Sequence, residues 1–227
     1  MADHTEDALI REVNDELREE QMMKLWQRYG GFVVGVALLV VVIVAGYQGW
    51  KHYTTTTRQE EGERFYAALQ LADTGNIDDA IGAFQKLSGD ASTGYGVLAQ
   101  FQQAILKSDA GDIPGAVALY AQIAKEQISE PTLSGLAAVL GATLEINAGG
   151  YDRAALELRL QAISGDGQPY RYTARELLGL IALDAGDTAT ARTQFEQLAN
   201  DAAAPQTIVQ RATDTLQSLS VQNLSTT

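Results

Sequence analysis

The sequence predicts an all-α protein: one N-terminal transmembrane helix, then an α-solenoid of four degenerate helix pairs, then a C-terminal capping helix. Three observations lead to this prediction. An uncharged apolar run covers residues 29–50, and turn glycines recur at nearly equal intervals through the rest of the chain. No segment shows the alternation of apolar and polar residues that is typical of strands.

Residues 1–28 form a charged arm with a helical pattern. Leu9, Ile10, Val13 and Leu17 recur at roughly helical spacing among many charged residues. This pattern is compatible with a solvated cytoplasmic tail. It is also compatible with a docking helix for a cytosolic factor or with a recognition signal for turnover.

Residues 29–50 contain no charged side chain, and they predict a transmembrane helix. Roughly 20 helical residues cross the ~30 Å hydrocarbon of a bilayer, and a helix satisfies its own backbone polar groups over that distance. The alternatives are a buried core helix and a cleaved signal peptide. The long charged segment ahead of the run and the poor cleavage site at Val44-Ala45-Gly46-Tyr47 argue against the signal peptide.

The basic residues that flank the run favour a cytoplasmic N-terminus. Four Lys or Arg residues precede it, and Lys51, Arg58 and Arg64 follow it. Cytoplasmic flanks carry the excess of Lys and Arg, and a short first tail usually stays inside. We therefore expect a single-pass protein of a bacterial inner membrane, with its C-terminal domain in the periplasm.

Within the apolar run, Gly31 and Gly35 have the small-xxx-small spacing that lets two membrane helices approach closely. If the motif acts, its partner is a copy of this chain or a helix of a larger membrane complex. The alternative is that glycine is simply common in membrane helices.

Composition limits the function classes that are open to the remaining chain. Eight acidic and four basic residues precede the run, giving −4, so −9 of the total net charge of −13 falls on the rest. That charge excludes a nonspecific nucleic-acid binder and argues against a domain lying flat on anionic lipid. There is no cysteine, and His4 and His52 fall on opposite sides of the predicted membrane, so we expect no metal or other cofactor.

The soluble part contains four similar turns with spacings of 36, 38 and 37 residues, which indicates a solenoid of repeated units. Glycine suits the left-handed end of one helix, and Asn or Asp can cap the next. The turns are Gly75-Asn76, Gly111-Asp112, Gly149-Gly150 and Gly186-Asp187.

Other positions recur at fixed distances from the first glycine of each turn, and they predict closely packed helix pairs. Five residues after it come Ala80, Ala116, Ala154 and Ala191. Nine residues after it come Phe84, Tyr120, Leu158 and Phe195. Seven residues before it come Ala68, Ala104, Ala142 and Gly179.

This pattern resembles tetratricopeptide repeats, which pair a small residue in the first helix with a turn glycine and then an alanine and an aromatic residue in the second. The family's first-helix Trp and Tyr are missing here, and Pro131 and Pro205 fall only near the place of its closing proline. The repeats are therefore degenerate. We expect helix pairs at 59–74/77–88, 95–110/113–126, 132–148/151–163 and 171–185/188–200, with a capping helix at 205–219.

The domain organisation that follows is an arm at 1–28, a transmembrane helix at 29–50, a tetratricopeptide-like repeat domain at 51–220 and a flexible tail at 221–227.

The whole chain resembles the bacterial inner-membrane tetratricopeptide-repeat-like proteins that are ancillary subunits of the Sec translocon, especially alphaproteobacterial forms. The segments that carry this resemblance are Lys24–Gly30, Gly46–Trp50, Gly94-Tyr95 and Tyr172–Leu180. The resemblance implies a periplasmic scaffold beside the translocon, with translocon subunits and a periplasmic chaperone as partners.

The leading functional hypothesis is an anchored adaptor that binds protein partners on an apolar concave face. Tetratricopeptide first helices line that face, and an apolar groove there suits extended or helical segments. The alternative is that these residues pack on one another or on the C-terminal helix. The candidates are Phe65, Leu69, Leu98, Phe101, Ile105, Leu136, Val139, Leu180 and Leu183.

A second hypothesis is an accessory or assembly subunit of another inner-membrane complex, respiratory or cell-envelope, in which the anchor dominates binding. An enzyme is not expected, because acid–base catalysis needs paired groups in a pocket, and the acidic residues here fall at turns and on helix surfaces. Gly165-Asp166-Gly167 is not a phosphate loop, since no Gly-Lys-Ser/Thr follows it. The oligomeric state stays open.

Overall fold

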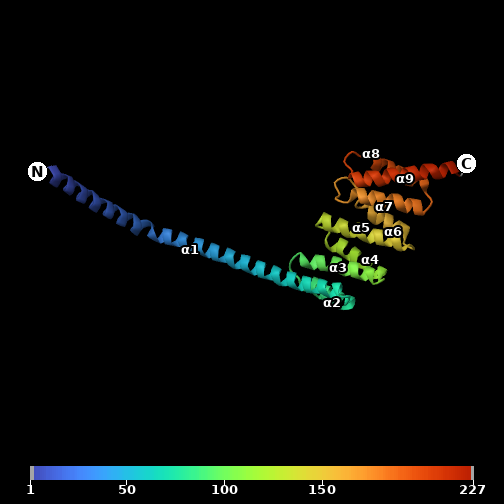
Figure 1. Cartoon of the computed structure of the whole chain (residues 1–227). Helices are drawn as coiled ribbons and strands as arrows, with labels where there is room; N and C mark the ends of the chain where they lie inside the picture. The colour runs from blue at the N-terminus through green and yellow to red at the C-terminus, as the bar shows by residue number, and fades with distance from the viewer. Residues whose placement is uncertain (1–2, 226–227) are drawn as a thin grey trace. The chain divides into compact units, whose positions relative to one another are not determined.

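The computed structural model describes the backbone of residues 3–225, and in that range all side chains except those of residues 3–22, 24–25, 33, 37 and 222–225. The described residues form helices and no strand, as predicted (Figure 1). Contacts divide the chain into two units, Met1–Arg58 and Gln59–Thr227; we call the second the repeat unit.

Helix α1 (Asp3–Asp73) contains the arm, the apolar run and the first helix of the first pair. It continues through the four threonines that follow Tyr53. There the hydroxyls of Thr54, Thr56 and Thr57 donate to carbonyls three or four residues earlier, at 3.1, 3.0 and 2.9 Å. Such bonds to the helix backbone allow Thr to occupy a helix interior.

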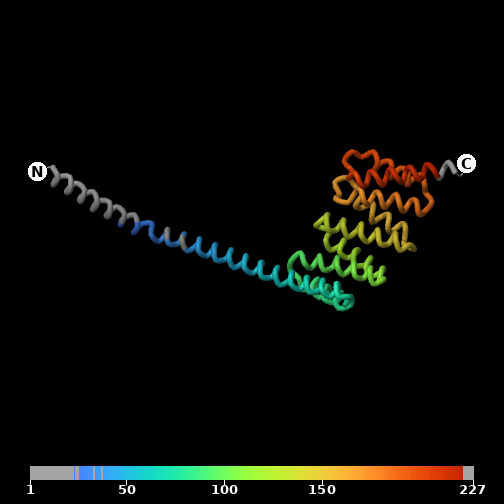
Figure 2. Tube along the Cα trace, in the orientation of Figure 1, coloured from blue at the N-terminus to red at the C-terminus, as the bar shows by residue number. Residues whose placement is uncertain are grey.

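In the repeat unit, the last part of α1 is followed by eight more helices, and the chain can be traced through them in Figure 2. Their bounds agree with the predicted pairs to within a few residues. They are α2 (Ile77–Asp90), α3 (Tyr95–Asp109), α4 (Ile113–Glu126), α5 (Pro131–Ala148), α6 (Arg153–Gln161), α7 (Arg171–Asp184), α8 (Thr188–Asn200) and α9 (Gln206–Ser225). Helix α9 thus extends into the predicted tail 221–227, of which residues 226 and 227 lie outside the described part.

Three of the four turns between paired helices are Schellman motifs with the same bonds. In the first, the Gly75 N–H donates to Ala72 O at 3.0 Å and the Asn76 N–H donates to Leu71 O at 2.9 Å. The second and fourth turns repeat this pattern, and Gly75, Gly111 and Gly186 have φ between 75° and 88°. The predicted role of these glycines is confirmed, because only glycine adopts that conformation without strain.

The third turn differs, and it shifts the register of α6. Gly149 and Gly150 both have positive φ, and the N-cap is Asp152, whose carboxylate accepts the Ala155 N–H at 3.1 Å. In the other pairs the cap directly follows the turn glycine, so this turn holds two extra residues.

The prediction that Ala154 and Leu158 are the buried positions of α6 is therefore wrong. Leu158 is 70% exposed, and Leu156 and Leu160 are buried in its place at 0% and 1%. Counted from the caps, Leu156 occupies the place of Ala80, Ala116 and Ala191, which are fully buried. A leucine at this crossing keeps α5 and α6 apart, and these two helices pack less closely than those of the neighbouring pairs.

The remaining predicted small and large positions are confirmed. Ala68, Ala104 and Ala142 are at most 2% exposed, and Phe84, Tyr120 and Phe195 fill the space beside the helix crossings. One cluster of buried side chains forms around each helix pair. The core of the repeat unit is thus a row of small clusters, as in other solenoids.

Candidate functional site

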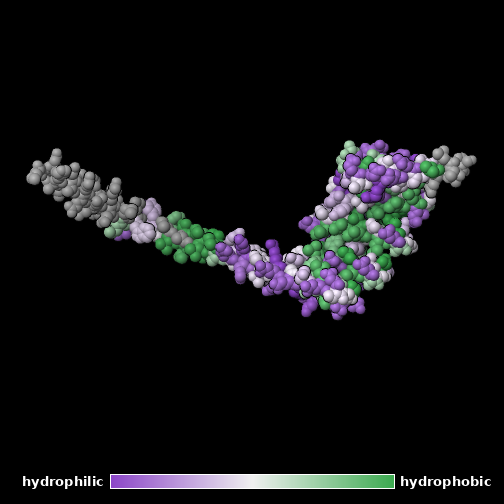
Figure 3. Space-filling model, viewed as in Figure 1, coloured by the Kyte–Doolittle hydropathy of each residue, from purple (hydrophilic) through white to green (hydrophobic). Residues whose placement is uncertain are grey.

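Three of the predicted concave-face residues are accessible. Leu98 and Ile105 on α3 are 48% and 40% exposed, and Leu180 on α7 is 38% exposed. Figure 3 shows hydrophobic residues gathered over the middle helices of the repeat unit. Exposed apolar patches mark protein-binding surfaces.

The other six predicted residues contribute to the core. Phe101 and Val139 are 8% and 5% exposed and belong to the clusters of the second and third pairs. Four are half-buried against core clusters: Phe65, Leu69, Leu136 and Leu183. For these six, the structure matches the alternative in which they pack on other parts of the chain.

A shallow pocket of about 200 Å³ opens beside Ile105, between α3 and α5. Ile105, Tyr120, Leu140 and Leu144 form its apolar part. Polar residues contribute the rest of the lining: Ser108, Asp109, Thr143 and Asn147. The pocket is large enough for one apolar side chain of a partner, and its polar residues can hydrogen-bond the partner's backbone next to that side chain.

Leu140 is a member of this pocket that the sequence prediction missed. It is 36% exposed and follows the predicted Leu136 by one helical turn, so the spacing of apolar residues on α5 carried the signal. Tyr120 is buried at the pocket base, and burial raises the pKa of its phenol, which the nearby Asp109 carboxylate raises further. The phenol is therefore neutral and polar at physiological pH.

Most cations of the repeat unit are already paired. Six ion pairs with distances between 2.6 and 3.0 Å tie basic to acidic side chains, including bidentate contacts of Arg159 with Glu145 and of Arg211 with Glu176. The unpaired remainder of the surface is therefore rich in carboxylates. Among the described residues, no group of three or more His, Cys, Asp or Glu side chains is placed to hold a metal ion.

The stretch of α1 that begins at Trp26 is long and apolar enough to cross a membrane. It is the one such stretch among the described residues. Only 6% of it is buried, whereas a core helix of a soluble protein would be mostly buried. Val42 is 71% exposed and Leu38 is 61% exposed. These values are consistent with a single-pass membrane anchor.

Gly31 and Gly35 lie on this stretch, and a Cβ added to either would meet no atom within 4 Å. Gly30 differs, since its added Cβ would meet the Trp26 ring at 3.3 Å. The surface around Gly31 and Gly35 is therefore open to another helix.

Comparison with known proteins fits this architecture. A family model described as a tetratricopeptide repeat-like domain matches residues 23–218, which is most of the chain. No curated protein matches it. By its helix pairs, its turn glycines and this match, the chain belongs to the tetratricopeptide repeat-like domain family.

Proposed function

We propose that this protein is a membrane-anchored scaffold, an ancillary subunit of the bacterial secretion translocon that links secreted clients to a periplasmic chaperone. Domains of the tetratricopeptide repeat-like type generally bind proteins and are not catalytic. The observation that carries the binding role is the pocket between α3 and α5, where Ile105 and Leu140 are exposed on a repeat unit of this family. The resemblance of the whole chain supports the translocon and the chaperone as partners.

The proposed topology places the N-terminal arm in the cytoplasm and the repeat unit in the periplasm of a single-pass inner-membrane protein. The exposed apolar stretch of α1 and the bias of flanking basic residues support it. Because the chain has no cysteine, one introduced thiol gives an unambiguous label. Gln206→Cys should react with a membrane-impermeant maleimide once the outer membrane is permeabilised, and Met23→Cys should not; the reverse pattern contradicts this topology.

The partners are tested by photo-crosslinking in intact cells. A crosslinker at Ile105 should capture translocon subunits or a periplasmic chaperone, which mass spectrometry identifies. A crosslinker at the exposed Glu196 on α8 is the control and should capture neither. Equal capture from both positions would mean that the α3–α5 pocket is not the contact surface.

A second candidate function is an accessory or assembly subunit of another inner-membrane complex, respiratory or cell-envelope. The observation that favours it is the open surface around Gly31 and Gly35. Replacing both glycines with leucine blocks close helix approach but leaves the repeat unit unchanged. Purification from mild detergent separates the two functions: loss of a respiratory or envelope complex on Gly31→Leu, Gly35→Leu supports this one, and unchanged recovery of translocon subunits supports the first.

A further inference from the structure

Two grooves lie between second helices of the repeat unit, apart from the α3–α5 pocket. One runs between α2 and α4 above α3 and has a volume of about 400 Å³. The other runs between α6 and α8 above α7 and has a volume of about 890 Å³. Neither groove shares a lining residue with the α3–α5 pocket.

Counting from the helix caps shows that the two grooves carry the same polar residues on one wall. Nine residues after the caps of α2 and α6 stand Gln85 and Gln161, and twelve residues after them stand Ser88 and Ser164. In both, the serine hydroxyl donates to the backbone carbonyl of the glutamine, at 2.9 and 3.1 Å. The local geometry of this wall is thus repeated together with its residue types.

The opposite wall repeats as well. Ten residues after the caps of α4 and α8 stand Gln122 and Gln197, which both line their grooves. The equivalent positions between α4 and α6 hold Ala121, Ala124 and Ala162. Amide side chains therefore line the grooves between α2 and α4 and between α6 and α8, and alanine replaces them between α4 and α6.

One wall of the α6–α8 groove belongs to the irregular third pair. Leu156 holds α6 away from α5, and α6 has 9 residues where α8 has 13. The amide of Gln194 and the hydroxyl of Thr190 add to the wall formed by α8. Amides and hydroxyls of this kind donate and accept, so they can bind both the N–H and the C=O groups of a polypeptide backbone.

Charged residues also line the α6–α8 groove. Arg153 and Arg175 are neutralised by Glu157 and Asp166, at 2.6 and 2.9 Å. Among the carboxylates that line the groove, Asp187 and Asp201 have no cationic partner within ion-pair distance. The Arg153 guanidinium nevertheless lies near enough to Asp187 to help lower the pKa of its carboxyl group.

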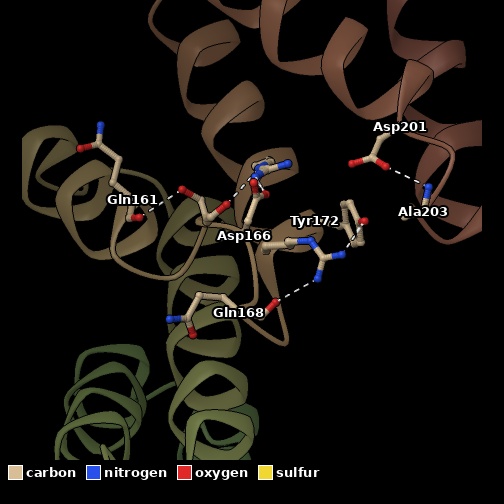
Figure 4. Close-up of polar contacts among 9 residues, drawn as sticks. Gln161, Asp166, Gln168, Tyr172, Asp201 and Ala203 are labelled. Atoms are coloured by element: carbon tan, nitrogen blue, oxygen red, sulfur yellow. Dashed lines mark hydrogen bonds and ion pairs between the residues drawn. The ribbon is translucent and has the colours of Figure 1, made fainter.

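Both carboxylates accept backbone bonds at the ends of α8. Asp187 accepts the Thr190 N–H at 3.0 Å, and that bond lowers the pKa of its carboxyl group. Asp201 accepts the Ala203 N–H at 2.9 Å, and Figure 4 shows it on the opposite side of the view from Gln161. The 13 residues of α8 separate the two carboxylates by roughly 20 Å along the helix.

We propose that the α6–α8 groove binds an extended polypeptide segment that carries two basic side chains about six residues apart. An extended chain advances about 3.3 Å per residue, so six residues match the separation of the two carboxylates. Gln161 and Gln197 hydrogen-bond the backbone of the segment from the two walls. The basic side chains pair with Asp187 at one end and Asp201 at the other.

The test uses the full-length protein in detergent and a fluorescently labelled synthetic peptide whose two termini are blocked. In this spaced peptide, five Gly and Ser residues separate two lysines. A reference peptide has the same composition with adjacent lysines. Fluorescence anisotropy at low ionic strength should show tighter binding of the spaced peptide. Asp187→Asn with Asp201→Asn should weaken that binding about fivefold, since exposed charge pairs contribute modestly. Asparagine retains both backbone bonds, so the helix ends are preserved.

A matched control separates specific pairing from general charge. Asp152→Asn with Asp214→Asn removes the same charge from residues outside the groove, and asparagine again suits the α6 cap. This pair should leave binding of the spaced peptide nearly unchanged. Gln161→Ala with Gln197→Ala should weaken binding of both peptides, because it removes backbone contacts. Equal affinity for the two peptides, or an equal loss in the control pair, overturns the proposal.

Binding at the α6–α8 groove requires neither the proposed partners nor the membrane. Substitution of Ile105 leaves the α6–α8 groove intact, and substitution of Asp187 and Asp201 leaves the α3–α5 pocket intact. Failure of one site is therefore distinguishable from failure of the other.

Discussion

The crossing of α7 and α8 gives the sharpest stability prediction. At Gly179 an added Cβ would lie 2.8 Å from Cζ and 2.9 Å from Cε2 of Phe195, whose side chain is 1% exposed. Carbon atoms in ordinary contact lie about 3.5–4.0 Å apart. Gly179→Ala therefore forces the buried ring and the α7 backbone apart by several tenths of an ångström.

The expected magnitude is the difference between two opposing effects. Overpacking of a core costs about 1–3 kcal/mol, and replacing Gly with Ala in a helix returns up to about 1 kcal/mol. We expect a net loss of about 1–2 kcal/mol in the free energy of unfolding. Gly82→Ala is the matched control, because Gly82 is exposed on α2 and its added Cβ meets no atom within 4 Å. That variant should gain about 0.5–1 kcal/mol.

Far-UV circular dichroism during urea unfolding of the full-length protein measures both variants. Tryptophan fluorescence is unsuitable for the repeat unit, because Trp26 and Trp50 both lie outside it. The midpoint should fall for Gly179→Ala and rise for Gly82→Ala. Two shifts of the same sign would refute the argument that the α7–α8 crossing has no room for a methyl group.

Substitutions at Leu156, Ile105 and Glu61 test other contacts of the repeat unit. Leu156→Ala should lower the free energy of unfolding, measured in urea, by about 2–5 kcal/mol because it leaves a cavity, whereas Leu158→Ala should change it by less than about 0.5 kcal/mol. A larger loss for Leu158→Ala would mean that the buried positions of α6 follow the spacing counted from Gly149. Ile105→Asp should abolish partner capture by the α3–α5 pocket without altering the helical circular dichroism, and retained capture speaks against that pocket. The thermal unfolding midpoint should fall less steeply between about pH 5 and pH 3 in Glu61→Gln than in the unsubstituted protein. An equal fall in both proteins would contradict the stabilising role of this carboxylate.

Glu61 is a buried carboxylate whose pKa is set by two opposing effects. Its side chain is 3% exposed, and burial raises the pKa. Hydrogen bonds from the Thr93 hydroxyl and from the Ser92 N–H and hydroxyl lower the pKa by more, so it lies below its usual value. A carboxylate with a depressed folded-state pKa stabilises the protein above its unfolded pKa of about 4.3. That stability is lost as the pH falls through the folded-state pKa.

Sequence reasoning located the helix pairs well, because glycine at a helix end and alanine at a helix crossing each have a single physical cause. It failed in the third pair, where distances were counted from Gly149. The cap Asp152, which begins α6, is the better origin, since helical phase starts there and two extra turn residues do not affect it. Counting from the cap would have placed Leu156 and Leu160 in the core and Leu158 outside it.

The accessibility of the concave-face residues is harder to predict, because side chains at nearby positions on one helix point in different directions. At about 100° per residue, Phe101 lies about 60° around α3 from Leu98, whereas Ile105 lies about 20° from it. That difference places Phe101 in the core and leaves Leu98 and Ile105 accessible. Without the neighbouring helices, the sequence does not specify which edge of the apolar stripe is covered.

The alternation of glutamine and alanine along the groove-bearing side has a consequence for how a bound chain is aligned. A ligand displaced by one helix pair would leave Gln161 and Gln197 and face Ala121, Ala124 and Ala162, losing every amide contact at once. A displacement of two pairs would bring it to Gln85 and Gln122 and restore those contacts. A segment that lies along α8 would therefore bind in the α6–α8 groove and not in the equivalent place between α4 and α6.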